Sequence, residues 1–317
     1  QLYNAVDSVV VGNYVGDNAL AAVGSAGPII NLLIVLFIGI SVGASIMVSQ
    51  YFGARNREAL SMTIGSCITL TAIAGIVMTV VGLIVVRPLL VILNTPTSIL
   101  DWSTSYLQII LLGSVGLAYY NILSGILRGL GDSISALVYL LVASGLNIVL
   151  DLLFVIYFDM GVNGVAWATI LAQAVSAILC FLRLSKMKDL FELKPSHLKM
   201  SKTHVMNIVR LGVPSGVTQA IMSMAMLIVQ SLTNSFGEQF IAANVIVMRV
   251  DGFAMLPNFS FGTTMTTYAG QNIGAGDQER VVKGSRQGLL LGVGTSAIIT
   301  LAILIFGKHL MAIFTPT

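Results

Sequence analysis

Charged residues are scarce in this 317-residue sequence, because Asp, Glu, Lys and Arg together make up only 9% of it. A soluble globular domain carries about 25% charged residues, so the composition excludes an ordinary soluble domain. Hydrophobic residues make up 56%, the mean hydropathy is +0.93, and long apolar runs recur along the whole length. A bilayer is crossed by ~20 apolar residues. The sequence therefore predicts an all-α polytopic membrane protein.

Cysteine, histidine and catalytic motifs are also missing or rare. Cys67 and Cys180 are isolated within apolar runs, which excludes a disulfide framework and a CxxC site. The histidines show no metal-ligand spacing, and no Walker, HExxH or GxSxG motif occurs. The run 129–132 matches the GxGD of intramembrane aspartyl proteases, but the Tyr-Asp pair of that chemistry is absent from the sequence. We expect no enzyme, no resident metal or cofactor, and no nucleic-acid partner.

An internal repeat is the strongest positive signal. The segment GDNALAA at 16–22 returns as GEQFIAA at 237–243, which is 221 residues later. At the same offset and without a gap, four further residues match: Gln50, Gly53, Ala54 and Glu58 with Gln271, Gly274, Ala275 and Glu279. The repeat predicts two copies of one multi-helix unit. Such duplicated membrane folds are the usual architecture of transporters, with the substrate path between the halves.

Turn residues and charges divide the chain into nine predicted helical segments. They cover roughly 1–15, 18–51, 56–86, 98–128, 133–157, 161–184, 201–235, 239–271 and 277–307. The first copy has six helices and the second has three, so both copies enter from the same side and the repeats are parallel. We expect a fragment, truncated at both ends, of a fold of about twelve helices. The predicted parts are an N-lobe at 1–185, a cytoplasmic linker at 186–200 and a partial C-lobe at 201–317.

Lys and Arg are concentrated in the loops of one side, which predicts the orientation. That side holds Arg55, Arg57, Arg128, Arg183, Lys186, Lys188, Lys194, Lys199, Lys202, Arg280, Lys283 and Arg286. The opposite side has Arg87 and Lys308 with several acids. The basic side is predicted to be cytoplasmic, in the cytoplasmic membrane of a prokaryote. We expect the linker to be solvated along the membrane face, and an anionic-lipid site there is the alternative.

Several local patterns resemble those of one family. They are DSVVVG at 7–12 with AAVG at 21–24, RGLGD at 128–132, NIVLD at 147–151 and GVNGVAWAT at 161–169. In order and spacing they are similar to the motifs of MATE (multidrug and toxic compound extrusion) transporters, most of all the prokaryotic branch with DNA-damage-inducible and archaeal members. The resemblance implies a two-lobe architecture and a cation-coupled antiporter. It also implies that the acids of the first and fifth helices are the coupling site.

Ionisable side chains at membrane depth are costly and are functional candidates by default. Asp7 lies nine residues before Gly16, roughly 13 Å below the outer end, and Asp151 lies roughly 9 Å below it. At these comparable depths the two acids could share one cavity. A desolvated pair of carboxyls can hold a proton, and with the Asn147 and Thr169 oxygens it could instead bind Na⁺ transiently. The sequence leaves the coupling ion, H⁺ or Na⁺, open.

Other side chains are candidates for a substrate cavity. Polar stripes on otherwise apolar helices and flexible methionines mark Tyr3, Asn4, Ser124, Gln173, Gln219, Met222, Met226, Arg249 and Asp251. Hydrogen bonding between helices is the alternative for the polar residues, and ordinary packing is the alternative for the methionines. For Arg249 and Asp251 a structural ion pair is as consistent as a transport role.

Together these features predict an antiporter that exports amphipathic, often cationic organic compounds by alternating access. Its expected partners are such drugs and membrane lipids, and we expect a monomer. The alternative is a lipid-linked precursor flippase of the same superfamily, which needs a strongly cationic cavity. Arg249 is the only basic residue that the sequence places at membrane depth. A channel is disfavoured, since nothing resembles a selectivity filter.

Overall fold

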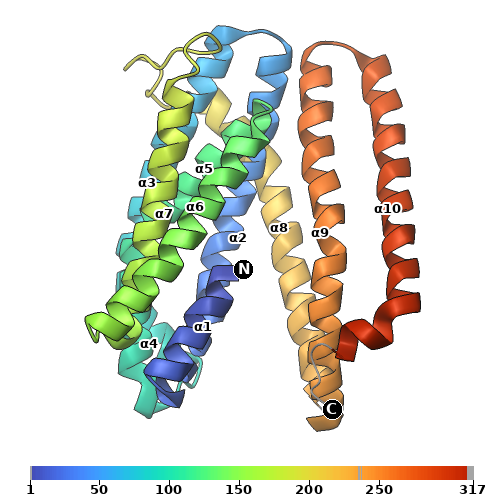
Figure 1. Cartoon of the computed structure of the whole chain (residues 1–317). Coiled ribbons are helices and arrows are strands. Elements are labelled where there is room, and N and C mark those ends of the chain that lie inside the picture. Colours follow the sequence, from blue (N-terminus) through green and yellow to red (C-terminus); the bar gives the residue numbers. More distant parts are fainter. Residues whose placement is uncertain (1, 235, 237, 313–317) are drawn as a thin grey trace. The chain divides into compact units, whose positions relative to one another are not determined.

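The computed structural model describes residues 2–234, 236 and 238–312, and this part of the chain contains helices and no strand (Figure 1). The elements are α1 (Leu2–Tyr14), α2 (Asp17–Gly53), α3 (Arg57–Ile92), α4 (Thr97–Leu112), α5 (Ser114–Gly129), α6 (Ser133–Leu152), the π-helical turn η1 (Leu153–Tyr157), α7 (Gly161–Ser185), α8 (Lys202–Asn234), α9 (Glu238–Gly274) and α10 (Gln278–Ala312). Among the described residues, five helices are long and apolar enough to cross a membrane, or six if α4 and α5 form one bent span. The predicted all-α membrane fold is confirmed.

The chain divides into two compact units. The first contains residues 1–48 and 56–216, and the second contains residues 49–55 and 217–317. In the first unit, α7 packs against α4, α5 and α6, and α1 packs against α6 and α7 (Figure 1). In the second unit, α9 packs against α10. The lobe boundaries expected from the sequence stay a prediction.

The single helix expected at 98–128 is wrong in one respect, because the chain bends there by 48° between α4 and α5. Gly113 lies at the bend, and a Cβ on this residue would overlap the side chain of Ile170 on α7. The bend therefore occurs where a glycine lets α7 approach the backbone closely. Ser114, the first residue of α5, is fully buried and shares a hydrogen bond of 2.9 Å with Thr79 of α3.

Glycines on α5 allow this helix to pack closely against α2. A Cβ on Gly125 would overlap the hydroxyl of Ser41, and one on Gly129 would come within 2.7 Å of the Ser45 carbonyl oxygen. The Ser41 hydroxyl donates a hydrogen bond of 2.6 Å to the Asn121 carbonyl, which ties the two helices together. Apolar lipid gives helices little hydrophobic reason to associate, so close backbone contact and such hydrogen bonds hold them.

A different face of α2 packs in the same way against the start of α8. Both helices carry glycines four residues apart, Gly39 and Gly43 on α2 and Gly212 and Gly216 on α8. A Cβ on Gly43 would overlap the carbonyl of Ile208, and one on Gly39 would come within 3.1 Å of the Gly212 carbonyl oxygen. This paired GxxxG spacing is a recognised basis for helix association in membranes.

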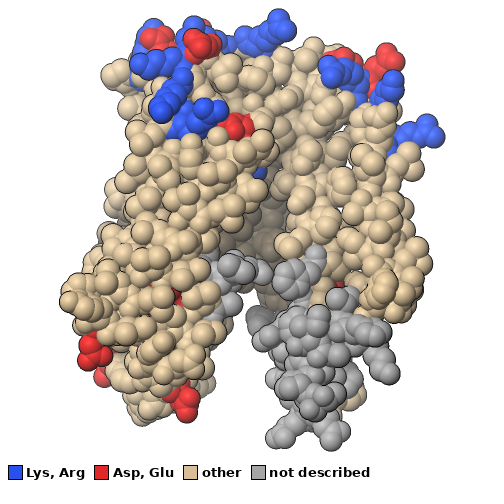
Figure 2. All heavy atoms as spheres, viewed as in Figure 1, with Lys and Arg blue, Asp and Glu red and all other residues tan. Residues whose placement is uncertain are grey.

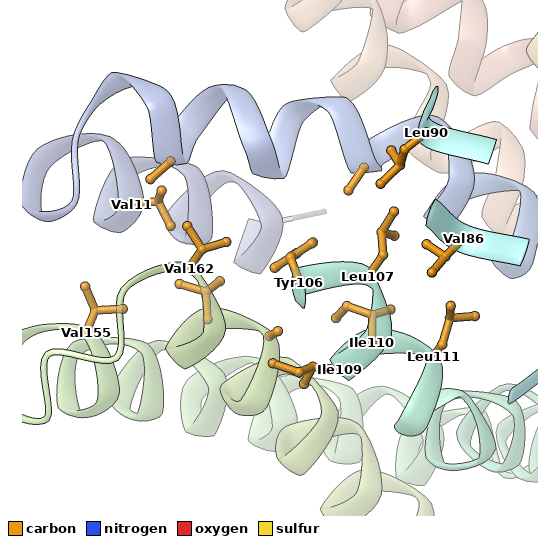
Figure 3. Packing of buried hydrophobic residues seen from close by; sticks show 14 of the residues in the cluster. Val11, Val86, Leu90, Tyr106, Leu107, Ile109, Ile110, Leu111, Val155 and Val162 are labelled. Carbon is orange, nitrogen blue, oxygen red and sulfur yellow. The ribbon is translucent and has the colours of Figure 1, made fainter. Parts of the chain in front are cut away.

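A cluster of buried apolar side chains fixes α1 in the first unit. Figure 3 shows Val11 of α1 close to Val162 of α7, with Tyr106 and Leu107 of α4 in the same cluster. Val11 and Leu107 are fully buried. Val11 lies four residues after Asp7, on the same face of a helix. The packing of this cluster therefore sets where the Asp7 side chain can lie.

Candidate functional site

Three polar side chains are buried where α1 meets α6. Asp7 is 3% exposed, Asn147 is 1% exposed and Asp151 is 0% exposed. Asn147 and Asp151 are four residues apart, so they lie on the same face of α6. Because α1 packs against α6 and α7, the two acids that the sequence singled out lie on adjacent elements.

The structure brings the four candidate coupling residues together. The Asp7 carboxyl lies beside the side chains of Asp151, Asn147 and Thr169. The Asn147 amide donates a long hydrogen bond of 3.4 Å to the Thr169 hydroxyl on α7. Three helices, α1, α6 and α7, therefore contribute to one small group of oxygen-bearing side chains.

Several oxygens of this group are buried and lack a hydrogen-bond partner among the described residues. They are one carboxyl oxygen of Asp7, both carboxyl oxygens of Asp151 and the Asn147 amide oxygen. The side chains thus approach one another without completing regular hydrogen bonds. A buried polar atom without a partner costs about 1–3 kcal/mol, and more when it is charged. A proton or a small cation shared between the carboxyls would remove that cost.

The π-helical turn η1 follows this group directly. It begins two residues after Asp151 and includes Val155, which is 4% exposed and belongs to the buried apolar cluster. Single π-helical turns within α-helices are frequent at functional sites. The turn also packs against α1, so the residues that directly follow Asp151 contact the element that carries Asp7. No feature of the sequence alone marks this turn.

A small cavity lies beside the group in the first unit. Its volume is about 40 Å³, and its lining includes Thr169, Gln173, Tyr106 and Leu117. A second, narrower crevice is lined by Asn147, Thr169 and Gln173. Water needs only about 10–15 Å³ of such space together with polar partners. The cavity can therefore bring water close to Thr169, at the edge of the acidic pair.

Two of the expected cavity residues are buried in the first unit. Gln173 is 6% exposed and lines the cavity described above. Ser124 is 2% exposed, and its hydroxyl donates a hydrogen bond of 3.0 Å to the Asn121 carbonyl one turn earlier. This bond lies within α5 and does not join two helices, so the role of Ser124 stays a prediction.

The remaining candidates lie in the second unit or outside the described residues. Gln219, Met222 and Met226 on α8 and Asp251 on α9 are exposed and belong to the second unit. The side chains of Tyr3, Asn4 and Arg249 lie outside the described residues. The expected substrate cavity and the Arg249–Asp251 alternative therefore stay predictions.

A wide groove is found in the second unit. It measures about 770 Å³ and is formed by α9 and α10 of the second unit. The Ser296 hydroxyl donates a hydrogen bond of 2.9 Å to Asn258 inside it. Its lining residues include no titratable side chain. The groove therefore lacks the chemistry that the acidic pair provides.

Comparison with known proteins identifies the fold. A profile of the MatE family matches residues 1–153 and 214–317. In Bacillus subtilis, the probable multidrug resistance protein YoeA is 29% identical over 98% of this chain and 68% of its own length. YpnP, a probable multidrug resistance protein of the same organism, is 30% identical over 98% of this chain and 70% of its own length. A MATE protein solved in a bent conformation has a TM-score of 0.91 at 25% identity, over 99% of this chain and 70% of that one.

The matched residues and the fold define a class: this is a multi-pass membrane transporter, not an enzyme. The chain belongs to the MatE family. The resemblance inferred from the motifs is confirmed.

Proposed function

We propose that the chain belongs to a secondary active antiporter that exports amphipathic, often cationic organic compounds in exchange for H⁺ or Na⁺. One observation carries the proposal: the carboxyls of Asp7 and Asp151 are buried side by side, and three of their oxygens have no hydrogen-bond partner among the described residues. Two buried carboxylates cost free energy when neither a proton nor a cation is bound to them. Binding of a proton or a cation removes that cost. Proton or cation binding is therefore linked to the packing of α1 against α6.

Coupling follows from the position of Asp7 relative to the apolar cluster. Val10 and Val11 lie within one turn of Asp7 and are buried against α7 and η1. A change in the charge of the acidic pair alters how closely α1 and α6 can approach. Because the valines follow Asp7 on the same helix, that change shifts α1 within the cluster. The two arrangements would bind substrate with different affinity and alternate its exposure to the two sides of the membrane.

The group can accommodate either ion. A proton can be shared between the two carboxyls. A transient Na⁺ would be bound by oxygens of Asp7, Asp151, Asn147 and Thr169, which are hard ligands of the kind that such cations prefer. Transport measured under an imposed pH gradient alone and under an imposed Na⁺ gradient alone distinguishes H⁺ coupling from Na⁺ coupling.

Relatives support a drug-like substrate in a prokaryotic cytoplasmic membrane. Besides the Bacillus proteins, a Staphylococcus aureus protein named multidrug export protein MepA is 21% identical over 99% of this chain. Met222 and Met226 are adaptable side chains exposed on α8, which suits varied apolar substrates. We propose that the transporter acts as a monomer.

The description of a structural neighbour bears on the flippase alternative. A Pyrococcus furiosus MOP-superfamily transporter, described as having a binding pocket of reverse polarity that suggests a different function, matches with a TM-score of 0.88 at 26% identity. A pyrophosphate-linked lipid would require a cationic pocket. The buried pair of Asp7 and Asp151 makes this site acidic, which favours the antiporter.

Dye efflux tests the proposal. The full-length gene, expressed in cells that lack their own efflux pumps, should confer ethidium efflux, and Asp7→Asn or Asp151→Asn should reduce it at least tenfold. Asp159→Asn is the matched control, since Asp159 is exposed at the end of the unit where α7 begins. Undiminished efflux by the Asp7→Asn variant would overturn the assignment. Scrambling of polyprenyl lipid without dye efflux would favour the flippase.

A further inference from the structure

We propose that residues 186–201, here called the basic linker, and the start of α8 form a binding site for an anionic phospholipid of the cytoplasmic leaflet. The basic linker follows α7 and precedes α8 within the first unit. Lysines would bind the phosphate of the lipid, and an apolar groove beside them would bind an acyl chain.

The basic linker is largely exposed, and it is held against α3 at several points. Four hydrogen bonds join it to α3: Arg57 Nη2 to Lys188 O (2.6 Å), Glu192 N to Ser61 Oγ (3.0 Å), Ser201 N to Ser66 Oγ (3.4 Å) and Thr69 Oγ1 to Leu198 O (2.6 Å). Phe191 is only 3% exposed. A Cβ on Gly65 of α3 would overlap the His197 carbonyl, so the backbones are in contact. The backbone that carries the lysines of the linker is thereby held in place before any lipid binds.

The basic linker contains five lysines with Lys202 included, namely Lys186, Lys188, Lys194, Lys199 and Lys202, against the two acids Asp189 and Glu192. Asp132 pairs with Arg183 at 2.7 Å, and Glu192 pairs with Lys194 at 3.1 Å. Lys199 and Lys202 are exposed, and their ammonium groups form no ion pair with any described residue. In Figure 2, Lys and Arg side chains gather at the end of the first unit where α7 runs into the linker. The charge left over at this end is positive.

An apolar groove lies next to these lysines. It has a volume of about 280 Å³ and is lined by Met200, Lys202, Val205, Met206 and Val209. Met200 is 47% exposed and Met206 is 56% exposed. One ammonium group within an otherwise apolar groove fits a phosphate whose acyl chain lies along the methionines and valines. A free inorganic anion would leave the apolar lining unused.

The orientation predicted from the loop charges places the groove at the cytoplasmic surface of the membrane. Basic residues near the cytoplasmic leaflet attract anionic lipid, by about fivefold in binding constant for each Lys or Arg. This attraction is screened within a Debye length of ~8 Å at physiological salt. A site that combines charge with apolar contact should therefore prefer an anionic over a zwitterionic phospholipid, and the preference should fall at high salt.

Fluorescence quenching by lipid tests the site. The reporter is Met200→Trp in the full-length protein, with Trp102, Trp167 and any other Trp replaced by Phe. The protein is placed in vesicles that contain dibrominated phosphatidylglycerol or dibrominated phosphatidylcholine. We expect phosphatidylglycerol to bind near the reporter at least fivefold more strongly, and the preference to weaken in 0.5 M salt, a concentration about threefold above physiological ionic strength.

Two charge variants make the result specific. Adding Lys199→Gln and Lys202→Gln to the reporter should bring the preference close to unity. Lys283→Gln with Arg286→Gln on α10 removes the same charge from the second unit and should leave the preference unchanged. Equal binding of the two lipids to the parent reporter, or no quenching by either, would overturn the proposal. Lipid binding is read without transport, so its failure leaves the proposed antiport untouched.

Discussion

Gly53 and Gly274 occupy equivalent places in the internal repeat, and each packs against the other's helix. Within the second unit, a Cβ on Gly53 would overlap the carbonyl of Gln271, and a Cβ on Gly274 would overlap the carbonyl of Gln50. Gln50 and Gln271 are themselves an equivalent pair, 221 residues apart. The residues that reveal the duplication in the sequence are thus the residues whose backbones touch. The same residue types recur in both copies because each glycine must be small enough to let the other copy's backbone approach.

Gly53→Ala and Gly274→Ala should each destabilise the full-length protein. Overpacking by a methyl group costs typically about 1–3 kcal/mol, and here the obstructing atoms are backbone. We expect a lower melting temperature in detergent for each variant, and a double variant whose loss is less than the sum, because both substitutions push apart the same contact. Gly24→Ala on α2 is the control, since a Cβ there meets nothing within 4 Å. Additive effects, or a control that melts as low as Gly53→Ala, would contradict this account.

Gly43→Ala tests the paired glycines of α2 and α8. Its Cβ would overlap the Ile208 carbonyl, so the helices must separate or shift. We predict a loss of thermal stability like that of Gly53→Ala and larger than that of Gly216→Ala, whose Cβ would have ordinary contacts at 3.7 Å or more. The measurement is the melting temperature of both variants side by side. Equal melting temperatures would show that this contact does not limit the packing.

Asp132 should make stability depend on pH. It caps α6 by accepting a hydrogen bond from the Ser135 amide, and it pairs with Arg183 at 2.7 Å. Burial alone would raise the pKa of Asp132, but the hydrogen bonds from Arg183 and Ser135 hold it below its ordinary value. Folding therefore favours the carboxylate. The stabilisation is complete above the ordinary pKa of about 3.9 and is lost as the pH falls through the lower folded value.

Two variants separate the cap of Asp132 from its charge. Asp132→Asn keeps a cap oxygen and removes the ion pair, whereas Asp132→Ala removes both, and a lost cap costs about 1 kcal/mol. At neutral pH the melting temperature should fall in the order wild type, Asn, Ala. The difference between wild type and Asn should shrink below about pH 4. A difference that is the same at pH 7 and at pH 3 would contradict the assignment.

The acidic site could be predicted from sequence because its signal is local. Asp7 and Asp151 are charged residues in apolar helices, and helical rise places them at similar depth. The bend at Gly113 could not, because it depends on contact with Ile170, a residue distant in sequence. The contact of the basic linker with α3 could not be predicted either. It is made by backbone groups of Lys188 and Leu198, which any residue type would provide.

The contacts of the glycine pairs could be predicted in part from the sequence. The spacing of Gly39 with Gly43, and of Gly212 with Gly216, is visible in the sequence and marks surfaces fit for close packing. Which helix occupies each surface is decided by the tertiary fold. Gly125 and Gly129 have the same spacing and pack against a different face of α2. Spacing alone therefore predicts a contact without its partner.

Gradient-driven transport in proteoliposomes tests the central claim most directly. The full-length protein, its Asp7→Asn and Asp151→Asn variants, the double variant and the Asp159→Asn control are reconstituted, and dye movement is followed under separately imposed pH and Na⁺ gradients. The account predicts that at least one gradient drives dye transport by the wild type and the control. Both single variants should lose that response, and the double variant should be no worse than either, because the carboxyls act as one unit. Transport by the Asp7→Asn variant that follows the imposed gradient as the wild type does would contradict the account.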